Sequence, residues 1–187
     1  MSISSSLTLV PPLSDGSYRG FVRLHLKAIM SFSTETDDMI KAAKEIYDIA
    51  GVRIDISSYE VLDFPEFADL RVGKCTAATI TAAQRKLFTN RNYAGPKDPV
   101  AYFINSTIPA SDGCAAYAPG APGMVIVKKA SQWALAHELG HVLGLSHVDD
   151  NRSLMTSNGT DKITCRPPKL SRLDIYLINQ SCYVNSL

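Results

Sequence analysis

The sequence predicts a mixed domain of α-helices and β-strands, and three observations support this prediction. Residues 18–56 read as a strand, a helix and a second strand in succession. A later helix, beginning near Ser131, is apolar almost all round, so it is expected in the middle of a domain. The length of 187 residues fits one domain of ordinary size. We therefore expect residues 1–187 to form a single domain, with an irregular lead-in over 1–17.

The first expected strand is indicated by strict alternation, the period of a half-buried strand. Its apolar positions are Val22, Leu24, Leu26 and Ala28, and its polar positions are Arg23, His25 and Lys27. His25 belongs to the exposed phase of this pattern, and we expect it at the surface.

A helix is expected after this strand. Thr34, with Asp37 three residues later, fits a helix N-cap. Apolar residues then recur at helical spacing as far as Ala50, and Gly51 supplies a stop. The second strand follows as alternating residues over 52–56. Such a unit is typical of a right-handed crossover between parallel strands.

The rest of the chain predicts three more strands and three more helices. The strands are expected at 100–104, 114–117 and 124–127, and the helices at 81–88, from a cap at Ser131, and at 170–178. The segment 119–123, rich in Pro and Gly, is expected to turn the chain. We find no internal repeat and no linker.

Composition excludes several classes of function. Nineteen Lys and Arg residues against 18 Asp and Glu residues leave a net charge of +1, so no overall field favours nucleic acid or an anionic membrane. No apolar run reaches the roughly 18 residues of a membrane span. We therefore expect neither a nucleic-acid partner nor a membrane partner.

Three of the four histidines of the chain lie in one 11-residue window, from His137 to His147. His137 and His141 are four residues apart and so share one face of the apolar helix, where both imidazoles can point at one ion. Gly144 can adopt the positive φ that ends a helix and brings His147 round as a third ligand. Three nitrogen ligands with an open fourth position are typical of a catalytic zinc. Glu138 lies beside this face without being an obvious ligand.

Two simpler interpretations of this window are a metal-free buried cluster and a structural zinc. Buried histidines and a buried Glu138 without any metal would carry a heavy desolvation cost. A structural zinc would require a fourth protein ligand and would leave Glu138 without a role. Both are disfavoured, and a catalytic metal site is predicted.

The window resembles the zinc-binding signature of the metzincin metalloproteases, HExxHxxGxxH followed by a Met-turn. Its five positions are His137, Glu138, His141, Gly144 and His147. Met155 stands where the methionine of the Met-turn would lie. The sequence around the histidines is most similar to that of matrixins and related bacterial enzymes. The resemblance implies a twisted, mostly parallel five-stranded sheet with an antiparallel edge strand. It also implies an active-site helix that completes an upper subdomain (18–147), and a small lower subdomain (148–187) with a terminal helix.

The resemblance also implies a function: a zinc-dependent endopeptidase that hydrolyses peptide bonds through a metal-activated water. In that scheme His137, His141 and His147 hold one Zn²⁺, Glu138 is the general base and acid, and Met155 packs beneath the site. A protein or peptide substrate is expected to add to an edge strand before the helix. The residues assigned there are Cys114, Ala115, Ala116 and Tyr117.

Three departures from the family pattern limit what is carried over. Ser157 stands where some metzincins have a metal-approaching tyrosine, so no tyrosine switch is expected. No calcium loop or second histidine cluster is evident, so one zinc is predicted. No cysteine precedes the first expected strand, so a matrixin-type cysteine-switch propeptide is not expected in this chain.

The chain after the Met-turn, 157–165, is expected to form one wall of the substrate pocket. Asp149 and Asp150 are candidates for hydrogen bonds near the ligands, with a solvated turn as the alternative.

The four cysteines allow three disulfide pairings, and none lies in a CxxC pair. Four free thiols are the alternative. The extracellular function that the resemblance implies favours two disulfides, Cys75–Cys114 and Cys165–Cys182.

Two other functions remain open at this point: a metal-dependent hydrolase of a non-protein substrate, and a zinc-retaining binding module. The intact Glu138 disfavours the second. We expect a secreted or exported monomer, although Met1–Ser6 lack the features of a secretory signal. A removed leader, another export route and an internal location are the three alternatives. The sequons at Asn105, Asn151 and Asn158 do not decide between them.

Overall fold

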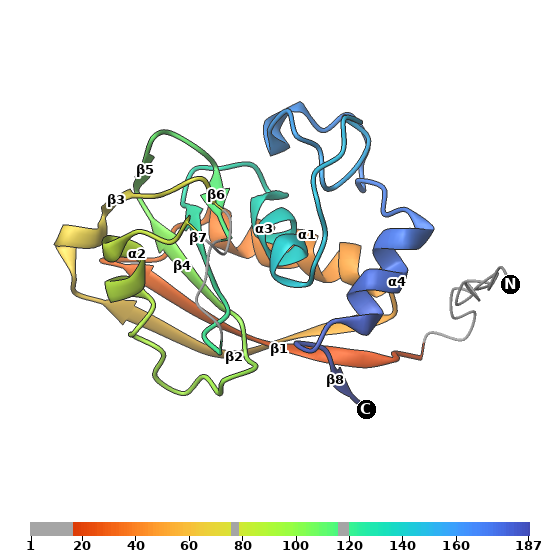
Figure 1. Ribbon diagram of the computed structural model, residues 1–187, viewed down its shortest axis with the longest axis horizontal. Coiled ribbons are helices and arrows are strands. Elements are labelled where there is room, and N and C mark those ends of the chain that lie inside the picture. The colour runs from red at the N-terminus through yellow and green to blue at the C-terminus, as the bar shows by residue number, and fades with distance from the viewer. Residues whose placement is uncertain (1–16, 76–78, 116–119) are drawn as a thin grey trace, which may run out of the picture.

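The computed structural model describes residues 17–75, 79–115 and 120–187, and a mostly parallel sheet forms its centre (Figure 1). Five strands follow the order β2-β1-β4-β7-β6. Their bounds are β1 Gly20–Ile29, β2 Val52–Leu62, β4 Val100–Ile104, β6 Gly113–Cys114 and β7 Gly123–Val127. All neighbours run parallel except β6, which pairs antiparallel with β7 at the edge. The expected five-stranded sheet is confirmed. A further strand, β8 (Asn185–Ser186), pairs antiparallel with the start of β1 and was not predicted.

The helices cover both faces of this sheet. Helices α1 (Glu35–Ile49) and α3 (Ala134–Val142) pack against each other over one face, and α2 (Ala82–Leu87) lies on the other side (Figure 1). The small elements near α2 are η1 (Pro65–Phe67) and the two-stranded pair of β3 (Asp69–Arg71) with β5 (Ser106–Ile108). The chain after α3 contributes η3 (Thr160–Lys162) and the predicted terminal helix α4 (Arg172–Gln180).

The buried strands divide their side chains between two hydrophobic clusters, one on each face. In β4, Ala101 and Phe103 pack with α1 and α3, whereas Val100, Tyr102 and Ile104 pack with the α2 side. Strand β7 divides in the same way, since Met124 and Ile126 join the first cluster and Val125 joins the second. Strands that are buried on both faces read as continuous apolar runs, as these two do in the sequence.

The N-terminal caps of two predicted helices differ from the structure. Helix α1 begins after Thr34 as expected, but the Thr34 hydroxyl donates to the Glu35 carboxylate and makes no capping bond to the backbone. Helix α3 begins after Trp133, because Ser131 forms a turn in which its carbonyl accepts from the Ala134 N–H. The Ser131 hydroxyl accepts from the Trp133 N–H, just before the helix, and donates to Thr160.

The prediction that His25 lies at the surface is wrong. His25 is only 2% exposed, and Asp98, in the loop before β4, lies beside its ring. The His25 Nδ1 lies 2.8 Å from the Ser58 hydroxyl, and its Nε2 lies 3.6 Å from the Asp98 carboxylate. Lys27 is fully buried on the same face and pairs with Glu60. Alternation in the sequence shows which residues share a face, but not whether a distant loop covers that face.

One of the two predicted disulfides is present. Cys75 and Cys114 are bonded, with their Cα atoms 5.0 Å apart. The pairing of Cys165 with Cys182 is wrong, since both are free thiols. Helix α4 lies between these two cysteines in the chain.

Among the described residues, no helix has both the length and the hydropathy that a membrane crossing requires.

The buried His25 gives a prediction for stability at low pH. Burial lowers the pKa of His25, with Lys27 and Arg91 acting in the same direction and Asp98 opposing them. The folded state therefore binds fewer protons than the unfolded state, whose histidine titrates near 6.5. We expect this stabilisation to be complete above that pH and to be lost as the pH falls below it. Urea unfolding at pH 7.5 and pH 5.0 should show that the parent protein loses more stability than His25→Gln.

The measurement is made with chelator present, so that the other three histidines titrate alike in both proteins. Equal losses in the two proteins would contradict the assignment of His25.

Candidate metal centre

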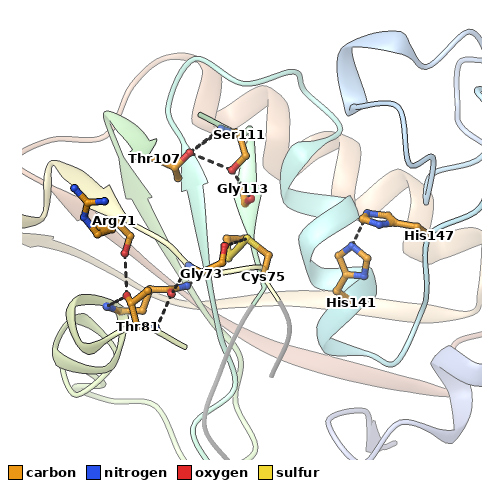
Figure 2. The surroundings of a disulfide bond; sticks show 11 residues. Arg71, Gly73, Cys75, Thr81, Thr107, Ser111, Gly113, His141 and His147 are labelled. Carbon is orange, nitrogen blue, oxygen red and sulfur yellow. Dashed lines mark hydrogen bonds between the residues drawn. A yellow bond between two sulfur atoms is a disulfide. The ribbon is translucent and has the colours of Figure 1, made fainter. Parts of the chain in front are cut away.

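Three imidazoles converge at the end of α3, as the sequence predicted. His137 and His141 lie one turn apart on the helix, and Gly144 adopts a φ of +101°, so the chain turns back just before His147. The Nε2 atom of His147 lies 3.1 Å from that of His137 and 3.0 Å from that of His141. Figure 2 shows His147 reaching from its loop toward His141 on the helix. The three residues form one group whose candidate ligand atoms all lie within 4.8 Å of one another.

Backbone carbonyls fix which ring nitrogens point inward as lone pairs. The Nδ1 of His137 lies 2.8 Å from the Leu154 carbonyl, and the Nδ1 of His141 lies 3.0 Å from the Leu145 carbonyl. A carbonyl oxygen only accepts, so both Nδ1 atoms must carry the proton and both Nε2 atoms are free to ligate. Burial lowers the pKa of all three histidines, to about 4 for His141, which keeps the rings neutral near pH 7.

This donor set fits a zinc ion. Tetrahedral zinc with bonds of 2.0–2.1 Å places its nitrogen ligands about 3.3 Å apart, within a few tenths of an ångström of the separations between His147 and its two partners. Lone pairs brought this close repel one another unless a cation lies between them. Hydrogen bonds from the outer nitrogens to carbonyls are the usual support for histidines that bind a metal.

The predicted Met-turn residue packs against the helix that carries His137 and His141. Met155 is fully buried, and its carbonyl accepts from the Val148 N–H at 2.8 Å, which ties the turn to the residue after His147. A Cβ atom at Gly140 would lie only 2.6 Å from the Met155 sulfur. Glycine at this position of α3 therefore allows the methionine to pack directly against the helix backbone.

Glu138 is 7% exposed and lies beside the histidine group. Burial raises the pKa of this carboxyl to about 8, while a hydrogen bond from the Ala115 backbone opposes the rise and the nearby Asp112 charge adds to it. A Cβ atom at Gly113 would lie 2.6 Å from the Glu138 Cγ. The edge strand β6 thus holds Glu138 from two sides, through Gly113 before Cys114 and Ala115 after it.

An open cleft of about 720 Å³ contains these groups. It is bounded on one side by the segment around β6 and on the other by the chain after His147, including Thr156, Ser157, Gly159 and Thr160. The expected contribution of 157–165 to the cleft wall is therefore seen at three of these positions. Of the residues predicted to bind substrate, Ala115 lines the cleft, and Cys114 is fully buried in its disulfide. Ala116 and Tyr117 lie outside the described residues.

The two aspartates proposed to support the ligands do not contact them. Asp150 pairs with Arg152, and Asp149 accepts from the Asn158 side chain. The carbonyls of Leu154 and Leu145 perform that role instead, and no side-chain pattern in the sequence could indicate a backbone partner.

A comparison with protein families matches the matrixin family model to residues 116–183, which include the three histidines, Glu138 and Met155. The fold and the histidine group agree with this match. The metzincin resemblance is confirmed. No curated protein matches the chain.

Two solved structures show how far the metzincin-like fold extends. Metalloproteinase-II from Bacteroides fragilis matches with a TM-score of 0.59 and 18% identity, over 89% of this chain and 54% of that one. The archaemetzincin from Methanopyrus kandleri matches with a TM-score of 0.58 and 18% identity, over 92% of this chain and 98% of that one. The chain spans about half the length of the Bacteroides protein. At this level of identity the likeness concerns the fold.

The sequence patterns did not indicate Asp112 and Gly113, which line the cleft near Glu138. Gly113 and Asp112 stand directly before the predicted strand at 114–117, but neither belongs to a periodic pattern. Their proximity to Glu138 depends on the pairing of β6 with β7, which is not visible in the local sequence.

The close contact between Gly140 and Met155 gives a prediction whose sign is unusual. Alanine normally stabilises a helix interior relative to glycine, by about 1 kcal/mol. We expect Gly140→Ala to destabilise this protein instead, by about 1–3 kcal/mol, because the new Cβ overlaps the Met155 sulfur. Chemical denaturation of the zinc-free protein measures this change.

Met155→Ala provides the matched background, since it removes the overlapping sulfur. In that background Gly140→Ala should cost little or become stabilising. The same cost in both backgrounds would show that the overlap with Met155 is not the cause.

Proposed function

We propose that the protein is a zinc-dependent endopeptidase. The observation that carries this proposal is the position of the Glu138 carboxyl, which lies in an open cleft beside three inward-pointing imidazole nitrogens. Zinc, when held by His137, His141 and His147, would polarise the scissile carbonyl and lower the pKa of a water molecule there. The chain's own residues perform the remaining tasks.

Glu138 is the proposed general base and acid. Its carboxylate takes a proton from the attacking water and passes it to the nitrogen of the leaving amine. Gly113 and the Ala115 backbone restrict the positions that this side chain can adopt. Restricting the carboxyl in this way lowers the cost of orienting it for proton transfer.

The substrate is proposed to lie along β6. This strand is the last on the path of the sheet and, among the described strands, pairs with β7 alone, so an extended peptide can add on its outer side. An open cleft beside a free strand edge suits an internal stretch of chain, which favours endopeptidase over exopeptidase activity. Action as a monomer outside the producing cell remains a prediction from the family resemblance.

The test pairs metal analysis with cleavage of denatured casein before and after chelator. We expect about one zinc per chain and cleavage that chelator abolishes. Zinc without cleavage of casein or of a peptide library would favour a binding module, and hydrolysis confined to non-protein substrates would favour another hydrolase. Absence of bound zinc would contradict the interpretation of the three histidines.

Glu138→Ala separates the carboxyl from the metal site. We expect this variant to keep its zinc and to lose cleavage activity by about 10²–10⁴-fold or more, the usual contribution of a general acid–base. His141→Ala is the comparison, because it should lose both zinc and activity. Casein cleavage by Glu138→Ala at the parent rate would contradict the proposed mechanism.

A further inference from the structure

Three distant segments meet at Asp112, on the rim of the cleft. The Thr160 hydroxyl in η3 donates to Asp112 Oδ2 at 2.9 Å, and the Ser131 hydroxyl before α3 donates to Thr160 at 2.7 Å. The turn that carries Asp112 is itself braced, since the Ser111 backbone N–H donates to the Thr107 hydroxyl at 2.7 Å and the Ser111 hydroxyl donates to the Gly113 carbonyl (Figure 2). These hydrogen bonds therefore hold the Asp112 carboxylate in one orientation and restrict its rotation.

The charge of Asp112 has no cationic partner among the described residues. Within the ranges 17–75, 79–115 and 120–187, Asp112 makes no ion pair, and its only hydrogen-bond donor is the neutral Thr160 hydroxyl, on Oδ2. The carboxylate is half-buried and lines the cleft. Lys74 lines the cleft beside Cys75, but it is exposed and forms no ion pair with Asp112. A partly desolvated carboxylate that is fixed in place attracts a cation strongly.

The position of Asp112 indicates which part of a substrate it would meet. Asp112 is close enough to Glu138 for their charges to interact, and Gly113 between them in the chain packs on the Glu138 side chain. Under the proposed function, Glu138 delivers a proton to the leaving amine. The neighbouring carboxylate of Asp112 therefore faces the residue that supplies this amine.

We propose that Asp112 makes the enzyme selective for substrates with a lysine or arginine directly after the scissile bond. The cationic head would pair with the free edge of the carboxylate, and the hydroxyls of Thr160 and Ser111 would offer further polar contacts. The same charge would disfavour an acidic residue at that position. This inference rests on the proposed endopeptidase function and adds the chemical class of its substrate.

The experiment uses the zinc-loaded protein and three peptides that differ at one position, occupied by Lys, Ala or Glu, with the cleavage site located by mass spectrometry. We expect kcat/KM to be at least about tenfold higher for Lys than for Ala, and lower again for Glu, as a desolvated charge pair implies. Asp112→Asn keeps an oxygen that accepts from Thr160 but removes the charge. It should reduce the Lys-to-Ala ratio to near one while leaving cleavage of the Ala peptide within a fewfold of the parent value.

Asp161→Asn is the matched control, since Asp161 adjoins Thr160 but is paired with Lys162 and does not line the cleft. It should keep the preference for Lys. Asp112→Lys is the second variant and should favour the Glu peptide. Zinc content and thermal unfolding show whether each variant has folded.

The possible results separate the two proposals. If the parent protein cleaves no peptide at all, the proposed function fails. If it cleaves all three peptides at similar rates, or if Asp112→Asn keeps the preference for Lys, the inference about Asp112 is overturned and the endopeptidase function stands.

Discussion

The hydrogen bond between His137 Nδ1 and the Leu154 carbonyl is the contact on which the site depends. It joins the buried helix α3 to the Met-turn, which comes from the other side of the cleft. Because the carbonyl holds the proton on Nδ1, the lone pair of Nε2 points inward. The Met155 sulfur packs against Gly140 on the same helix and keeps Leu154 at this distance. Gly140 in α3 and Met155 in the turn thus support the orientation of the His137 imidazole, although neither residue is a candidate metal ligand.

The second constraint is the short edge strand β6. It has only two residues and, within the described part of the chain, pairs only with β7, which gives it few backbone hydrogen bonds. The disulfide from Cys114 to Cys75 adds a covalent anchor to this weak element. Glu138 depends on the anchor, because Gly113 and Ala115 flank Cys114 and are the residues that hold the carboxyl. The expectation that Cys114 belongs to the substrate strand is consistent with its place in β6, but its side chain serves the anchor.

Features that depend on residues close together in the sequence were predictable, and features that depend on distant residues were not. His137, His141, Gly144 and His147 were predictable, because helix periodicity alone brings the first two together and a glycine turn brings the last. The central strands were also predictable, since burial on both faces leaves an apolar run. His25 was misplaced because the residues beside its ring, Ser58 and Asp98, are more than 30 and 70 positions away in the chain. The pairing of Cys165 with Cys182 failed although the helix between them was predicted, because cysteine spacing alone does not show where the two ends of the segment lie in the fold.

A site of this kind opposes the stability of the fold that carries it. The Nε2 atom of His147 lies close to 3 Å from the Nε2 atoms of His137 and His141, whose lone pairs point inward, and a carboxyl lies beside them with little solvent to stabilise its charge. Each of these features costs free energy in the metal-free protein. A cation bound between the imidazoles would relieve both, and since the unfolded chain cannot bring the three rings together, that binding would favour the folded state. The continuous apolar packing of α1, α3 and the central strands supplies the stability that lets α3 carry three polar groups, His137, Glu138 and His141, to the cleft.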